Sequence, residues 1–152
     1  MEAVVASVIA VLGTLLGAVV AGLLQHRMAR RERTAVQASE LRRERLAAVT
    51  ALVAALAEHR RAMWVREDLR LSGAAEAAYE QARAESHATR AAITAPLTAV
   101  RILVPALAEQ AELAARASYG LRRSATAEVL DASRMAAIDA ADRLVGSAAT
   151  AL

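Results

Sequence analysis

Apolar residues follow two patterns along the chain: an unbroken run near the N-terminus and helical stripes further on. The run, Ala3 to Leu24, holds 22 residues without a charge, and only Ser7 and Thr14 interrupt it. At 1.5 Å per residue it forms roughly 33 Å of helix, which matches a hydrocarbon core of about 30 Å. The pattern predicts a transmembrane helix within residues 1–24.

A cleaved signal peptide is the competing interpretation of this run, with Val19 to Ala21 as a small-residue cleavage site. A signal peptide needs a basic n-region and an apolar core of roughly 7–15 residues. Here the chain begins with Met1 and Glu2, and the run is too long. These features favour an uncleaved span.

Charges on either side of the run predict its orientation. Only Glu2 precedes it, whereas a basic cluster follows it: Arg27, Arg30, Arg31 and Arg33. Because arginine is retained on the cytoplasmic side, the sequence predicts an N-terminus outside the cell membrane and a cytoplasmic segment from residue 25 to residue 152.

Small residues recur at four-residue spacing within the run, at Gly13, Gly17 and Ala21. Such spacing lets two helices approach closely in lipid, so it predicts membrane self-association. Glycine and alanine are also common in spans of every kind, and the sequence does not separate the two interpretations.

The segment 25–45 predicts a solvated helical stalk, because it holds seven arginines, three glutamates and almost no apolar stripe. Its arginines would gain roughly 1 kcal/mol each beside anionic lipid headgroups. The simpler interpretation, a topology signal continuing into an ordinary helix surface, is the favoured one.

Helix-bundle spacing predicts the architecture of residues 46–152. A stripe that begins near Leu41 continues through Leu46, Val49, Val53, Leu56 and Met63, and Leu52, Leu56 and His59 widen it to one side. Ser72 and Gly73 should end this helix, since no glycine or proline occurs between Gly22 and Gly73.

Three or more further helices are expected after this turn. They cover 74–93, with Pro96 as a kink or a break, then 98–104 and 106–119, and a last helix capped by Ser124 or Thr126. The apolar stripe of the last helix is Leu130, Ala137, Ala141, Leu144 and Ala148. The predicted fold class is therefore all-α: a single transmembrane helix that continues through the stalk into a small antiparallel bundle.

Composition supports this fold and excludes several chemistries. The chain has 42 alanines among 152 residues, all 19 basic residues are arginine, and there is no cysteine or phenylalanine. Alanine and arginine favour helix, and the absence of cysteine excludes disulfides and thiolate chemistry. With so few large apolar side chains the core is thin, which favours a homo-oligomer.

Two polar segments, 58–68 and 83–90, lie at equal distances from the turn at Gly73, so the spacing predicts that they meet across the hairpin. They form either a polar cluster that fixes the register of the hairpin, which is the favoured interpretation, or a partner-binding face around the single tryptophan. The residues concerned are His59, Arg60, Arg61, Trp64, Arg66, Glu85, His87 and Arg90.

No catalytic, cofactor-binding or metal-binding residues are predicted, and the chain is not expected to be an enzyme. Glu85 and His87 are two residues apart and point to nearly opposite helix faces, unlike the Glu-x-x-His pairs of di-iron bundles. No nucleophile or glycine-rich loop accompanies the histidines.

Three stretches of the sequence resemble the small KilB-like spread proteins of Streptomyces plasmids and related actinobacteria. They are 7–17, then 46–50 running into 59–64 and 66–68, and 83–94 with Pro96 and Leu97. The resemblance covers most of the chain and weakens after Pro105. It implies a membrane-associated accessory of conjugation that works with other spread proteins and an FtsK-like DNA translocase, and it supplies no catalytic residue.

Together these patterns predict a non-enzymatic, single-pass membrane scaffold that acts through protein contacts in plasmid transfer and spread. Membrane lipid and a second copy of the chain are expected partners. The alternative is a membrane-tethered protein that binds nucleic acid through the arginine-rich stalk. Residues 25–152 carry a net charge of only +4, from 19 arginines and 15 carboxylates, so any such binding is expected to be nonspecific.

Overall fold

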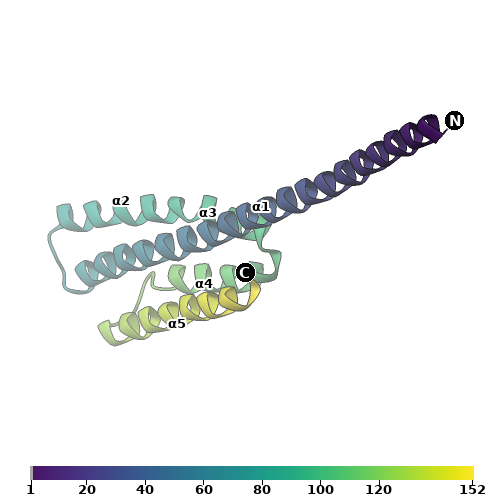
Figure 1. Cartoon of the computed structure of the whole chain (residues 1–152). Helices are drawn as coiled ribbons and strands as arrows, with labels where there is room; N and C mark the ends of the chain where they lie inside the picture. Colours follow the sequence, from purple (N-terminus) through teal and green to yellow (C-terminus); the bar gives the residue numbers. More distant parts are fainter. Residues whose placement is uncertain (1) are drawn as a thin grey trace. The chain divides into compact units, whose positions relative to one another are not determined.

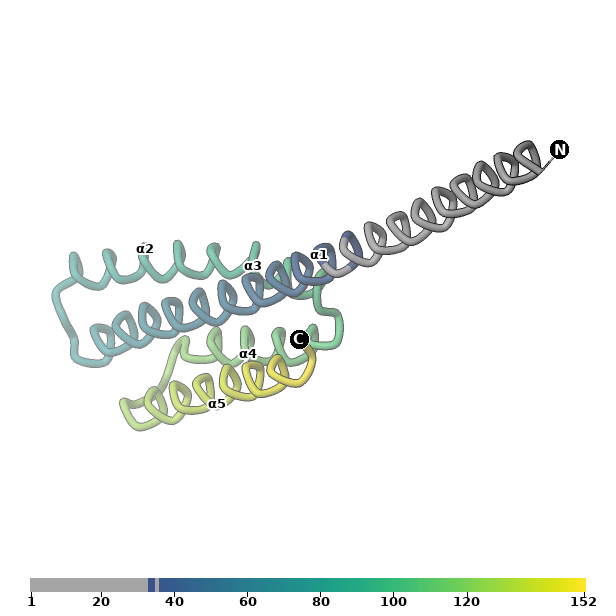
Figure 2. The backbone as a smooth tube through the Cα atoms, in the orientation of Figure 1, coloured from purple at the N-terminus to yellow at the C-terminus, as the bar shows by residue number. Residues whose placement is uncertain are grey.

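The computed structural model describes the side chains of residues 33–34 and 36–152, which are coloured in Figure 2. The chain divides into two compact units, 1–41 and 42–152. The described residues form helices and turns without a strand, so the predicted all-α class is confirmed.

The helices of the second unit form an antiparallel bundle (Figure 1). The long helix α1 (Glu2–Leu71) ends here, α2 (Glu76–Ala92) and α3 (Thr94–Leu103) run back along it, and a 3₁₀ turn, η1 (Pro105–Leu107), leads into α4 (Ala108–Tyr119). The last helix, α5 (Ala127–Ala151), packs against α4.

The turn between α1 and α2 forms as the sequence predicts. Gly73 has a φ of +68°, a left-handed conformation that costs glycine little. Its N–H donates to the carbonyl of Arg70, and the N–H of Ala74 donates to that of Leu69, so the last carbonyls of α1 are satisfied.

The later boundaries resolve two open alternatives. Pro96 lies in the first turn of α3, where its missing N–H leaves no hydrogen bond unmade, so it separates two helices. Thr126 caps α5 by accepting a hydrogen bond from the N–H of Val129. Ser124 instead donates to the carbonyl of Leu121.

The buried face of α1 includes Val49, Leu56 and Met63 of the predicted stripe but not the start of that stripe. Leu41 and Leu46 are 39% and 57% exposed, whereas Leu52 and Leu56 are fully buried, so the stripe does not begin at Leu41. The core centres on the side of α1 that continues to His59, because α3, α4 and α5 pack there. The predicted stripe of α5, from Leu130 to Ala148, is buried throughout.

The predicted transmembrane helix and its small-residue face, Gly13, Gly17 and Ala21, lie outside the residues whose side chains the structure describes. Arg27, Arg30 and Arg31 lie outside them as well. Among the described residues, none of the helices combines the length and apolar character of a membrane span. The described part of the stalk, residues 33–34 and 36–44, is exposed to solvent.

Candidate functional site

Two hollows on the bundle are candidate functional sites, and we call them the polar pocket and the apolar groove. The polar pocket, of about 230 Å³, lies where α1, α2 and the end of α4 meet. The apolar groove, of about 540 Å³, lies between α1 and α5. Both belong entirely to the unit 42–152.

The polar pocket confirms the prediction that the two histidine segments meet across the hairpin. Its lining residues are His59, Met63, Arg66, Ser86, His87, Arg90, Tyr119 and Arg122. Nδ1 of His59 lies 3.1 Å from the hydroxyl oxygen of Thr89, thirty residues further along the chain. The hairpin between α1 and α2 therefore brings these two side chains together.

His59 is a buried histidine with one unpartnered nitrogen. Its side chain is 1% exposed, its ring meets that of Tyr119 edge to face at 5.5 Å, and its Nε2 has no hydrogen-bond partner among the described residues. Burial, and secondly the charge of Arg90, lower the pKa of His59 to about 4, although the backbone of Ser86 acts in the opposite direction. The ring is therefore neutral near pH 7.

Arg66 is the most buried arginine of the pocket, at 8% exposure. Its two terminal nitrogens donate to the hydroxyls of Ser86 and Tyr79, each at 3.3 Å, while its Nε has no hydrogen-bond partner among the described residues. The carboxylate of Glu67 lies 3.9 Å from that Nε, but Arg70 already holds it at 2.7 Å. A buried carboxylate is thus shared by two arginines.

Arg90 and Arg122 complete the basic lining. The guanidinium of Arg90 lies 3.8 Å from the centre of the Tyr119 ring, a close cation–π contact that fixes its plane. Neither arginine forms an ion pair with a carboxylate in the described part of the chain. The pocket therefore carries uncompensated positive charge.

The other predicted residues do not join this pocket. Trp64 is half-buried against α5, where its indole N–H donates to Asp131 at 3.0 Å and Arg134 lies over its ring. Arg60 is half-buried on the same side; desolvation, and secondly Arg134, lower its pKa, whereas Asp142 raises it. Arg61 pairs with Glu58 in solvent, and Glu85 is exposed.

The predicted partner face is thus divided between two sides of α1. Sequence patterns did not mark the residues that complete each half: Tyr119 and Arg122 in the pocket, and Asp131 and Arg134 at Trp64. Thr89 lies within the predicted segment 83–90, whereas Asp131 lies 67 residues from Trp64, and no short-range spacing signals that contact. The described residues contain no cluster of His, Asp and Glu that could hold a metal ion.

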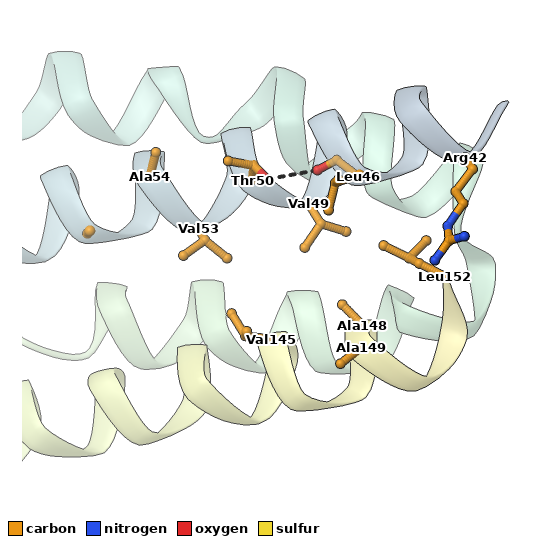
Figure 3. Close-up of a pocket in the computed structure, with 11 residues that line it drawn as sticks. Arg42, Leu46, Val49, Thr50, Val53, Ala54, Val145, Ala148, Ala149 and Leu152 are labelled. Carbon is orange, nitrogen blue, oxygen red and sulfur yellow. Dashed lines mark hydrogen bonds between the residues drawn. The ribbon is translucent and has the colours of Figure 1, made fainter. Parts of the chain in front are cut away.

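The apolar groove was not predicted. Figure 3 shows Val49 and Val53 of α1 pointing towards Val145 and Ala148 of α5. The other lining residues are Leu46, Thr50, Ala54, Ala57, Ala149 and Leu152, with Arg42 as the single charged residue. The small alanine side chains on both helices leave space between them, and Leu46 and Val145, which also line the groove, are about half exposed.

Comparisons with known proteins agree with the resemblance described above. The family described as KilB plasmid transfer protein matches residues 46–152. Protein KilB of Streptomyces lividans is 58% identical over 146 residues, which cover 95% of this chain and 96% of the relative. No solved structure matches the chain.

Proposed function

The chain belongs to the KilB family of plasmid transfer proteins, and from this premise we propose that it is a membrane-anchored scaffold of the transfer apparatus. In this proposal the N-terminal helix crosses the cell membrane and the bundle binds a partner protein on the cytoplasmic side. The contacts serve the spread of plasmid DNA between hyphal compartments. The apolar groove carries the proposal, because it is an exposed surface of the kind that binds another helix.

The membrane part of the proposal rests on the uncharged run Ala3 to Leu24 and the arginine cluster that follows it. We place the N-terminus outside the cell and residues 25–152 in the cytoplasm. Because the chain has no cysteine, single cysteines can report its topology. With a membrane-impermeant maleimide, Glu2→Cys should react in intact cells and Ser72→Cys only after permeabilisation. The reverse pattern, or equal labelling of both, contradicts this placement.

Self-association through Gly13, Gly17 and Ala21 is a separate part of the proposal. Gly17→Ile should reduce dimerisation of the span in a membrane-association reporter, because a large side chain keeps the helix backbones apart. Val11→Ile is the matched control, since it adds a methyl group away from this face. If Gly17→Ile leaves association unchanged, this face is not the contact.

We assign the apolar groove to an amphipathic helix of another transfer protein, with the other spread proteins and the FtsK-like translocase as the first candidates. Such a helix would cover Val49, Val53 and Val145 with its apolar side. Arg42 at one end of the groove forms no ion pair among the described residues, so the helix should also carry a carboxylate that meets it. The alternative occupant is a second copy of this chain, and the following experiment distinguishes the two.

A photo-crosslinking residue at Thr50, which lines the groove and is exposed, tests this assignment in mating mycelium. We expect a crosslink to a protein encoded by the same plasmid. The same group at the exposed residue Gln81 of α2 should give none. A crosslink only to a second copy of the chain would refute the assignment.

Function is tested by placing a charge in the groove. Ala54→Glu should reduce plasmid spread, because Ala54 is exposed in the groove and a carboxylate there blocks an apolar helix. Ile102→Glu is the matched control, since Ile102 is 70% exposed on α3 and does not line the groove. Equal losses of spread in both variants, at equal protein levels, would show that the groove is not the binding surface.

A further inference from the structure

We propose that the polar pocket binds a small phosphate anion that still carries a proton, hydrogen phosphate. Three arginines and the buried His59 line a hollow of about 230 Å³, and Nε2 of His59 and Nε of Arg66 are buried without a hydrogen-bond partner among the described residues. The proposal is independent of the groove and of the partner assigned to it.

The lining of the polar pocket is positively charged. Arg66, Arg90 and Arg122 line the pocket and no carboxylate does. The carboxylate of Glu67 lies 3.9 Å from Nε of Arg66 but is held more closely by Arg70, at 2.7 Å. Cations gathered in a partly enclosed site attract an anion more strongly than they would in water, because the surroundings screen them less. Arginine forks also match the geometry of phosphate oxygens.

Two buried nitrogen atoms of the pocket residues lack hydrogen-bond partners within the described part of the chain. Nε2 of His59 and Nε of Arg66 are buried without a hydrogen-bond partner among the described residues, in side chains that are 1% and 8% exposed. Buried polar groups nearly always have a partner, and leaving one without costs about 1–3 kcal/mol in folding. A ligand in the pocket would supply the partners that the protein lacks.

The hydrogen-bond directions explain why the anion needs a proton. The hydroxyl of Thr89 lies 3.0 Å from the carbonyl of Glu85 and 3.2 Å from that of Ser86. With its proton directed to either carbonyl, its oxygen can accept from the Nδ1–H of His59, and we assign this tautomer to the neutral ring. The neutral ring then presents a bare acceptor at Nε2. Hydrogen phosphate donates its O–H to that nitrogen while its other oxygens accept from the arginines. Sulfate has the same shape but no proton at neutral pH.

Groups from every side of His59 support this arrangement. Arg66 comes from its own helix, His87 and Arg90 from α2, Tyr119 from α4, and Arg122 from the loop before α5. Tyr119 contacts both the His59 ring and the guanidinium of Arg90. It therefore helps to hold both side chains in place before any ligand arrives.

Titration calorimetry of the full chain in detergent, at constant ionic strength with chloride as the background anion, tests the proposal with inorganic phosphate at pH 7. We expect one phosphate per chain and at least tenfold weaker binding of sulfate. Glycerol 3-phosphate in a parallel titration tests the need for the proton, because a phosphate monoester has mostly lost its second proton at pH 7. It should bind more weakly than inorganic phosphate, and equal or tighter binding would contradict the role of the proton.

Variants locate the site. Arg90→Gln and Arg66→Gln should each weaken phosphate binding about 10- to 100-fold, the range for losing a charge-assisted hydrogen bond. Arg61→Gln is the control, because Arg61 pairs with Glu58 in solvent, away from the pocket. Arg90 is exposed, so its variant keeps the test valid if Arg66→Gln fails to fold. The proposal is overturned if phosphate does not bind, if sulfate binds equally well, or if Arg61→Gln weakens binding as much as Arg90→Gln.

Discussion

Acidification should destabilise the bundle through His59, because the folded chain holds this ring where a positive charge is unfavourable. The ring is 1% exposed and faces the guanidinium of Arg90 across the pocket. Burial and Arg90 lower its pKa from 6.5 to about 4 in the fold. In the unfolded chain the same ring is in water and titrates normally.

The sign and size of the change in the free energy of unfolding with pH follow from proton binding by His59. Between about pH 6.5 and pH 4 the unfolded chain binds a proton that the folded chain does not, so the free energy of unfolding falls as the pH falls through this window. From pH 7 to pH 5 the loss attributable to His59 is about 2 kcal/mol. Below about pH 4 both states are protonated, and His59 makes no further contribution to the slope.

Urea unfolding of the full chain in detergent, followed by the fluorescence of the single tryptophan, measures this loss at pH 7 and pH 5. His59→Gln should lower the pH dependence by about 2 kcal/mol, whatever its effect on absolute stability. Arg90→Gln should lower it by a smaller amount, because burial is the larger cause of the shift. If His59→Gln and the unchanged chain lose equal stability between the two pH values, the ring is not held neutral by the fold.

Further predictions concern particular positions and are measured by the same unfolding assay. Leu56→Ala should cost about 2–5 kcal/mol, because Leu56 is fully buried in the core, and an effect below about 1 kcal/mol would show that the site is not closely packed. Gly73→Ala should cost about 1 kcal/mol through its φ of +68°, whereas Gly146→Ala, in the open interior of α5, should stabilise by about 0.5–1 kcal/mol; equal effects would contradict the backbone argument. Thr126→Ala should cost about 1 kcal/mol through the lost cap of α5. Thr150→Ala makes the same chemical change at an exposed position near the other end of α5 and should cost little.

Local sequence signals were sufficient to predict where the helices of the described bundle end and begin. The turn at Gly73, the break at Pro96 and the cap at Thr126 are each set by a residue with a distinct backbone or side-chain property. The start of the buried stripe of α1 was predicted less well, because Leu41 and Leu46 are exposed. Both sides of this helix are apolar near Leu46 and Leu52, and only the position of α3, α4 and α5 decides which side is buried.

Only the part of the site that the hairpin of α1 and α2 contributes could be predicted from the sequence. Equal distances from Gly73 place His59 opposite α2, and the contact with Thr89 follows. The contributions of Tyr119 and Arg122 depend on how α4 folds back after η1, and Asp131 reaches Trp64 across 67 residues. The groove is harder still to predict, because alanine is equally compatible with a buried and an exposed helix face.

The alanine-rich interfaces explain why polar contacts are kept inside such a thin core. Three alanines of α4 and four of α5 are buried: Ala111, Ala114 and Ala115, and Ala137, Ala140, Ala141 and Ala148. Helix faces of this kind are smooth, so a slip of one turn, about 5.4 Å, would exchange one alanine contact for another at little cost.

Polar contacts of α1 remove this freedom, because each has a partner at a single position. The guanidinium of Arg45 donates to the carbonyl of Leu103 at the end of α3, that of Arg70 to the carbonyl of Ser124 before α5, and the indole of Trp64 to Asp131 within α5. A one-turn slip of α3 or α5 along α1 would break these hydrogen bonds and leave charged groups without partners. The large apolar residues thus supply cohesion, while the arginines and the tryptophan of α1 select one register among several that alanine alone would permit.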